Sequence, residues 1–170
     1  MRQPPPLYNE THQHRWLSNI THTTHNPHNT QQQTAISLSD FVGKNLVLYF
    51  YPKDDTPGCT LEAQQFTALA DAFATLNTAV VGISQDDCAS HQAFIDKYQL
   101  NVQLLADTDG SICQNYGVWQ EVEKDGVKKW KIVRSTFIID PQGQLASVEY
   151  SVNPDGHAQT VLEHIQHMNR

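Results

Sequence analysis

The stretch that decides the fold is Leu46-Val-Leu-Tyr-Phe-Tyr-Pro-Lys-Asp-Asp-Thr-Pro-Gly-Cys59. Its first six residues are apolar or aromatic and have the length of a strand, so they predict a buried strand. Thr56 then offers a side-chain oxygen as helix N-cap, and Pro57 suits the first helical position. The stretch therefore predicts a strand that leads through a short loop into a helix with Cys59 in its first turn.

This position favours a reactive thiol at Cys59. The unpaired backbone N–H groups and the positive end of the helix dipole stabilise an anion in the first turn, and therefore the thiolate over the thiol. Gly58 lacks a Cβ, which leaves room for a small molecule to approach the sulfur. A single cysteine is more often an inert buried residue. The strand end, the Thr-Pro cap and the glycine favour the functional interpretation here.

Length, charge and cysteine content narrow the classes of function. A chain of 170 residues fits one catalytic domain, and its net charge of −7 does not favour a nucleic-acid partner. The basic run at 128–131 lies near a predicted hairpin and is best explained as a solvated face. No apolar stretch has the length of a membrane span, and no secretory signal is evident. Three cysteines argue against a disulfide-stapled extracellular domain, so a reducing cytoplasm is the expected setting.

Composition changes near residue 34. Residues 1–34 are polar, with few charges, and carry histidines at 12, 14, 22, 25 and 28. Such a segment buries too little apolar surface to offset the entropy of ordering it, so we expect it to be mobile and residues 35–170 to form the domain. The histidine spacing fits no closed metal site, and neither cysteines nor an acidic cluster complete one. We expect no metal and no other cofactor.

The chain after Cys59 alternates helical and strand patterns. Helical spacing continues from Cys59 to Leu76, and a strand, a helix, a short strand and a short helix follow at 79–84, 89–98, 104–106 and 111–116. Two hairpins, turning at 125–126 and 142–143, and a last helix at 158–167 complete the pattern. This order predicts an α/β sandwich, with a central mixed sheet flanked by helices.

The motif Pro52-x-x-x-Thr56-x-x-Cys59 resembles the active-site signature of the peroxiredoxins, and residues 48–63 are similar to the bacterioferritin comigratory protein or peroxiredoxin Q branch. The likeness covers about residues 35–170. Further strings stand in the family's order and spacing: 80–84 (VVGIS), 90–91 (SH), 104–107 (LLAD), 116–119 (YGVW), 134–140 (RSTFIID) and 156–158 (GHA). The resemblance implies a thioredoxin-like fold.

The resemblance also implies a role for each residue of the site. Cys59 would be the peroxidatic cysteine, with Thr56 and Arg134 as its hydrogen-bonding partners. Pro52 would shield it from bulk water, and Glu62 would anchor the arginine. Glu62 could equally be an ordinary acidic residue near a helix N-terminus.

The chemistry of peroxide reduction gives an independent reason to expect Arg134 in the site. When a thiolate attacks one oxygen of a peroxide, the leaving oxygen gathers negative charge, so both oxygens need positioned donors. A guanidinium supplies permanent charge and several fixed donors. Arg134 is the only arginine between Arg15 and Arg170, and it lies beside the predicted strand 135–140. We therefore expect it in the site; the alternative is a solvated surface arginine.

The sequence departs from the family at its amino terminus. Residues 1–34 lack the usual Gly-x-x-Ala-Pro-x-Phe opening, so the sequence does not decide whether the family's first hairpin forms. A diverged strand around 15–20 is one alternative.

The second departure concerns the resolving cysteine. In many relatives a second cysteine, the resolving cysteine, reduces the oxidised peroxidatic cysteine. The two positions at which relatives carry it are Gln64 and Ile95 here. Cys88, near the start of the second predicted helix, is the candidate for that role, and Cys113 fits a core position better. We expect a cycle that uses Cys59 alone.

The sequence thus predicts a thiol-dependent peroxidase that reduces hydrogen peroxide and small organic hydroperoxides without metal, haem or flavin. Its expected reductant is thioredoxin or a related thiol donor, and its expected state is a monomer or weak homodimer. The alternative is a redox sensor or holdase on the same fold, which turnover distinguishes. A general disulfide oxidoreductase is disfavoured because the chain has no Cys-x-x-Cys pair.

Overall fold

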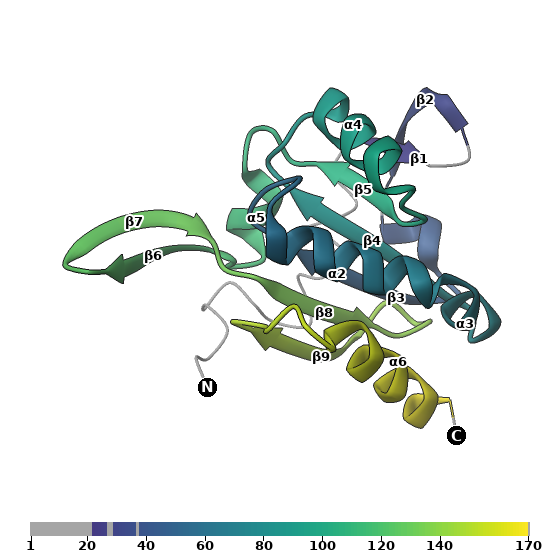
Figure 1. Cartoon of the computed structure of the whole chain (residues 1–170). Coiled ribbons are helices and arrows are strands. Elements are labelled where there is room, and N and C mark those ends of the chain that lie inside the picture. The colour runs from purple at the N-terminus through teal and green to yellow at the C-terminus, as the bar shows by residue number, and fades with distance from the viewer. Residues whose placement is uncertain (1–21, 27–28, 37, 170) are drawn as a thin grey trace.

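A seven-stranded mixed sheet organises the molecule. The computed structural model describes residues 22–26, 29–36 and 38–169. The strand order is β2-β1-β5-β4-β3-β8-β9 (Figure 1). The strands are β1 (His22–Asn26), β2 (Asn29–Ile36), β3 (Asn45–Phe50), β4 (Thr78–Ser84), β5 (Gln103–Ala106), β8 (Ser135–Ile139) and β9 (Leu145–Tyr150).

The middle of the sheet is parallel and its two sides are antiparallel. β3, β4 and β5 run parallel to one another, whereas β8 pairs antiparallel with β3, and β1 pairs antiparallel with β5. Parallel neighbours need a crossover connection. Here α2 (Pro57–Ala68) and α3 (Ala70–Thr75) connect β3 to β4, and α4 (Cys88–Tyr98) connects β4 to β5. The predicted α/β class with a mixed sheet between helices is confirmed.

Strand β3 is buried on both faces because its alternate side chains enter two different cores. Val47 and Tyr49 pack in one core with side chains of α2, α3, α4 and α6 (His157–Met168). Leu46 and Leu48 pack in the other, which includes residues of α5 (Ser111–Asn115). This two-sided burial explains the continuous apolar run in the sequence.

The amino-terminal hairpin changes the predicted boundary. β1 pairs with β2 and also with β5, so residues 22–26 and 29–36 extend the sheet, and the boundary expected at residue 34 falls inside β2. The residues of both strands are mostly polar, so hydrophobic patterning in the sequence did not reveal them. The alternative strand at 15–20 lies outside the described residues, and the mobility expected of residues 1–34 stays a prediction.

A second hairpin forms a separate two-stranded sheet that extends from the body (Figure 1). It comprises β6 (Trp119–Lys124) and β7 (Val127–Ile132). Asp125 and Gly126 both have positive φ, 54° and 78°, as a tight hairpin turn requires. The turn predicted at 125–126 is confirmed.

Within the described part of the chain, no helix has the length and apolar character needed to cross a bilayer.

The helix predicted from Cys59 to Leu76 is two helices in the structure. Leu69 lies between α2 and α3 with φ −102° and ψ 8°, so the backbone departs from helical geometry at this residue. The apolar period continues across the break because both helices face the same core. Periodicity alone therefore did not reveal the interruption.

Candidate active site

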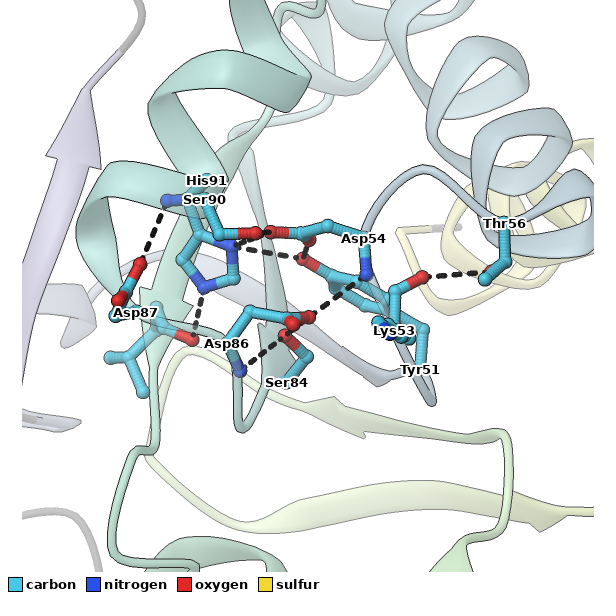
Figure 2. Close-up of polar contacts among 10 residues, drawn as sticks. Tyr51, Lys53, Asp54, Thr56, Ser84, Asp86, Asp87, Ser90 and His91 are labelled. Carbon is cyan, nitrogen blue, oxygen red and sulfur yellow. Dashed lines mark hydrogen bonds and ion pairs between the residues drawn. The ribbon is translucent and has the colours of Figure 1, made fainter.

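Cys59 is the third residue of α2 and is 1% exposed. Thr56 occupies the N-cap position, as predicted, but the predicted side-chain cap bond is absent. Its hydroxyl instead donates to the carbonyl oxygen of Lys53 at 2.8 Å (Figure 2). This bond closes the turn before the helix and directs the hydroxyl away from the first-turn N–H groups. Those N–H groups therefore donate no hydrogen bond to the Thr56 side chain.

Arg134 bridges the cysteine and a buried carboxylate. It lies in the short connection between β7 and β8, 75 positions after Cys59 in the sequence. Its Nη2 donates to Cys59 Sγ at 3.3 Å, and its Nη1 donates to Glu62 Oε1 at 2.8 Å. The structure thus brings together three of the residues that the sequence analysis assigned to the site.

Burial sets the electrostatics of this group. Glu62 is 0% exposed, and burial raises its pKa to about 7 although the charge and hydrogen bond of Arg134 act in the opposite direction. Its Oε2 has no hydrogen-bond partner among the described residues. Burial also opposes the charge of Arg134, but Glu62 and Cys59 outweigh it and hold the Arg134 pKa above its usual value. The guanidinium therefore stays positive beside the sulfur.

Gly58 has a different role from the one that its sequence suggests. The space over this glycine was expected to admit a small molecule. In the structure, a Cβ on residue 58 would lie 3.1 Å from Nη2 of Arg134 and 3.4 Å from Cγ of Pro154. The guanidinium occupies the space, so the lack of a side chain at Gly58 lets Arg134 approach the cysteine.

Pro52, the last of the expected site residues, lies in the bend after β3 and is exposed. The shielding role of Pro52 and the hydrogen-bonding role of Thr56 toward Cys59 stay predictions.

The described residues contain no cluster of histidine, cysteine and acidic side chains that could hold a metal. His22 and His25 lie in β1, and the other histidines of residues 1–34 lie outside the described residues.

Tyr49 belongs to the surroundings of the site, and the sequence analysis assigned it no role. Its ring stacks on Phe66 of α2, with centroids 4.7 Å apart. Burial, followed by the charges of Glu62 and Cys59, raises the Tyr49 pKa well above its ordinary value, so the phenol stays neutral. The sequence did contain a signal for the position of Tyr49, because residues at alternate positions of the predicted strand, 47, 49 and 51, share one face.

The raised pKa of Glu62 predicts a pH-dependent stability. Below about pH 4.5 Glu62 is protonated in both the folded and the unfolded protein. Between that pH and about 7 the unfolded protein ionises this group more readily than the folded one, so the contribution of Glu62 to the free energy of unfolding is lost as pH rises through about 7. Relative to Glu62→Gln, the parent should lose on the order of 3 kcal/mol of unfolding free energy between about pH 4.5 and pH 8. Denaturant unfolding at several pH values measures this difference.

Glu163→Gln is the matched control, because Glu163 is an exposed carboxylate on α6. That variant should keep the pH slope of the parent. An unchanged slope in Glu62→Gln would contradict the expected burial of this carboxyl group.

Comparisons with known proteins agree with this geometry. Residues 20–148 match the model of the AhpC/TSA family. The bcp protein of Helicobacter pylori is 50% identical over 128 residues, which cover 75% of this chain and 84% of that protein. Peroxiredoxin Bcp of Bacillus subtilis is 37% identical over 135 residues, which cover 79% of this chain and 86% of that protein.

Solved structures extend the likeness to the fold. The bacterioferritin comigratory protein of Xanthomonas campestris superposes with a TM-score of 0.82 at 32% identity, covering 89% of this chain and 93% of its own. A mutant of PrxQ from Xylella fastidiosa has a TM-score of 0.83 at 30% identity, covering 100% of this chain and 99% of its own. These matches confirm the expected thioredoxin-like fold. The chain belongs to the AhpC/TSA family, among its Bcp or peroxiredoxin Q members, and is a thiol-dependent peroxidase.

Proposed function

We propose that the chain reduces hydrogen peroxide and small organic hydroperoxides at Cys59 and takes its electrons from thioredoxin or a related thiol donor. One observation carries this proposal: a guanidinium lies 3.3 Å from the Cys59 sulfur and is held by Glu62 at 2.8 Å. The structural study of the Xanthomonas campestris relative concerns alkyl peroxide reduction, which supports the organic substrates.

In the first step, the Cys59 thiolate attacks one oxygen of the peroxide. An S–O bond forms while the O–O bond breaks, and the leaving oxygen takes up a proton to give water or an alcohol. Arg134 is placed to donate to the sulfur before attack and to a peroxide oxygen as negative charge develops. Cys59 becomes a sulfenic acid.

In the second step, a donor thiol attacks the sulfenic sulfur and water leaves. This gives a mixed disulfide, which a second thiol resolves to return the Cys59 thiol. One peroxide thus consumes two thiols and yields an alcohol or water, one further water and one disulfide. No metal, haem or flavin is needed for this balance.

The positions of the other cysteines support a cycle that uses Cys59 alone. Cys113 is buried in the core that contains Leu46 and Leu48, whereas Cys59 is in the opposite core, so the sheet separates them. Burial, followed by Asp107, raises the Cys113 pKa far above its usual value and keeps that thiol protonated. Cys88 is partly exposed at the start of α4 and remains the rival candidate for a resolving role.

The residues at the family's two resolving positions also support this cycle. Ile95 is 4% exposed and belongs to the same core as Cys59, so an apolar side chain fills the place of a thiol there. Gln64 is exposed on α2.

We expect the enzyme to work in a reducing cytoplasm, as a monomer or weak homodimer, without nucleic-acid or membrane partners. Among the residues whose side chains the structure describes, the exposed large apolar ones are few (Val42, Leu61, Val127 and Trp130), which supports this state.

Substitution of Arg134 by lysine tests the proposed site. Lysine keeps the charge but loses the planar pair of donors that reaches both Glu62 and Cys59. The second-order rate constant for oxidation by hydrogen peroxide should fall at least about tenfold, equivalent to roughly 1.4 kcal/mol. Stopped-flow competition kinetics measure it.

Cys59→Ser, which should consume no peroxide, is the reference for zero activity. The parent should consume many equivalents of peroxide in the presence of thioredoxin and its reductase. An unchanged oxidation rate in Arg134→Lys would remove the arginine from the mechanism, and consumption of about one equivalent would instead indicate a sensor.

A methyl group at Gly58 should separate stability from activity. Because its Cβ would lie 3.1 Å from Nη2 of Arg134, Gly58→Ala should displace the guanidinium from the sulfur and slow oxidation severalfold. Alanine in place of a helical glycine should at the same time leave the unfolding free energy equal or raise it by up to about 1 kcal/mol. Paired kinetic and denaturation measurements check both effects. An oxidation rate equal to that of the parent would show that the guanidinium does not depend on this glycine.

Removal of the other thiols tests the cycle. Cys88→Ser and Cys113→Ser should each keep most of the steady-state turnover. Excess peroxide should convert Cys59 readily to sulfinic acid, because no internal thiol intercepts the sulfenic acid. Loss of turnover in Cys88→Ser, together with a Cys59–Cys88 peptide pair in non-reducing maps, would establish an internal resolving partner.

A further inference from the structure

The loop between β3 and α2 is fastened by a buried carboxylate. Asp54, 7% exposed, lies at the centre of a polar cluster (Figure 2). Its Oδ1 accepts a hydrogen bond from the Tyr51 hydroxyl at 2.6 Å. Its Oδ2 contacts His91 Nδ1 at 2.7 Å and accepts from the Ser90 hydroxyl at 2.8 Å. Three side chains, two of them from α4, therefore converge on one carboxylate.

His91 has acceptors on both sides. It is 0% exposed, and its Nε2 lies 3.2 Å from the carbonyl oxygen of Leu105 in β5, opposite the Asp54 contact of Nδ1. A ring nitrogen makes a hydrogen bond to an acceptor only when it carries a proton. The ring therefore lies between the loop and β5, with an acceptor within hydrogen-bond distance of each of its nitrogens.

The backbone of the same loop is fastened from a second direction. The Asp54 N–H donates to Oδ2 of Asp86 at 2.8 Å, and the Ser84 hydroxyl donates to the same oxygen at 2.7 Å (Figure 2). Asp86 lies between β4 and α4. Both the side chain and the main chain of Asp54 are therefore held by elements outside α2.

The adjacent Asp55 contacts the other end of α4. It has a φ of 59°, which is uncommon for a residue with a side chain. Its carboxylate accepts from Lys97 at 2.8 Å and from the Tyr98 hydroxyl at 2.5 Å, both in the last turn of α4. We call the contacts of Asp54 and Asp55 with α4 the loop clamp. It fixes the chain four to five residues before Cys59.

We propose that Asp54 and His91 are positioning residues for the oxidation of Cys59, which hold the first turn of α2 in register with Arg134. This inference rests on the proposed role of Cys59. Only residues 51–56 separate β3 from α2, so a shift at Asp54 passes directly to the first turn. Small misplacements of a reacting group are expensive in rate. Neither residue touches the sulfur; each acts through the position of the turn.

The clamp should affect the two half-reactions differently. Cys59 is 1% exposed, so a donor thiol reaches the oxidised sulfur only when the first turn moves outward. An intact clamp holds the turn for peroxide attack and opposes that movement. A weakened clamp should therefore slow oxidation without slowing reduction by an external thiol. A residue that merely stabilised the fold would alter both steps in parallel or neither.

Asp54→Asn and His91→Gln test the inference. Asp54→Asn keeps the size of the side chain but removes the carboxylate, and His91→Gln removes the imidazole ring that contacts it. Asp107→Asn is the matched control: this carboxylate is likewise buried, at 0% exposed, but it accepts from backbone N–H groups of Ile112 and Cys113 in α5. The measured quantities are the rate constants for oxidation by hydrogen peroxide and for reduction of the oxidised protein by dithiothreitol, with thermal unfolding as the check of folding.

In Asp54→Asn and His91→Gln, oxidation should slow at least about fivefold while reduction stays equal or becomes faster. Asp107→Asn should show parental rates whatever its unfolding temperature. A smaller loss of oxidation in both variants, or equal losses in the two half-reactions, would overturn the inference.

Ser90→Ala provides a second measure should the buried variants fail to fold, because Ser90 is partly exposed and gives one of the donors to Asp54. Its oxidation should slow at least about twofold without slower reduction. Unchanged oxidation in a folded Ser90→Ala, with no folded buried variant, would overturn the inference. Failure of the proposed function is distinguishable, because the parent itself would then show no oxidation at Cys59.

Discussion

The site depends on one guanidinium, because Arg134 bonds through one nitrogen to Glu62 and through another to Cys59. Cys59 and Glu62 belong to the same helix, whereas Arg134 enters from the connection between β7 and β8. The antiparallel pairing of β8 with β3 brings that connection beside the start of α2. Gly58 then removes the side chain that would keep the guanidinium away.

Burial makes this contact both strong and finely balanced. A guanidinium shared by two acceptors is worth more in a poorly hydrated site than at the surface, but a buried carboxylate is costly to ionise. The pKa of Glu62, raised to about 7, expresses that competition. Near neutral pH the carboxyl group therefore lies close to the point at which it gains or loses its charge. A protonated Glu62 leaves more of the Arg134 charge for the sulfur.

The chemistry of the site could be predicted from sequence because it depends on local order. A strand, a turn and a helix start place Cys59 in a first turn whatever surrounds them, and the lone internal arginine marked a positioned cation. The contact of Gly58 with Arg134 could not be predicted, because it joins segments that are far apart in the chain. The bond from Thr56 to Lys53 was also missed, since a hydroxyl has several local acceptors and the sequence does not rank them.

The fold was predictable where hydrophobic patterns were strong and not where they were absent. The run beginning at Leu46 gave the central strand, whereas the polar residues of β1 and β2 gave no alternation that reveals an edge hairpin. Asp54 and His91 stand in strings that resemble the family, but nothing in the sequence indicated that they contact each other. Their pairing becomes visible only when α4 lies against the loop.

The most direct test of the account is the site of the first oxidation. The protein, fully reduced, is treated with one equivalent of hydrogen peroxide in the presence of a reagent that traps sulfenic acids, and its peptides are analysed by mass spectrometry. The account predicts that the trapped group lies on the peptide containing Cys59 and forms at least about tenfold more slowly in Arg134→Lys. Trapping on Cys88 or Cys113, with Cys59 unmodified, would contradict it.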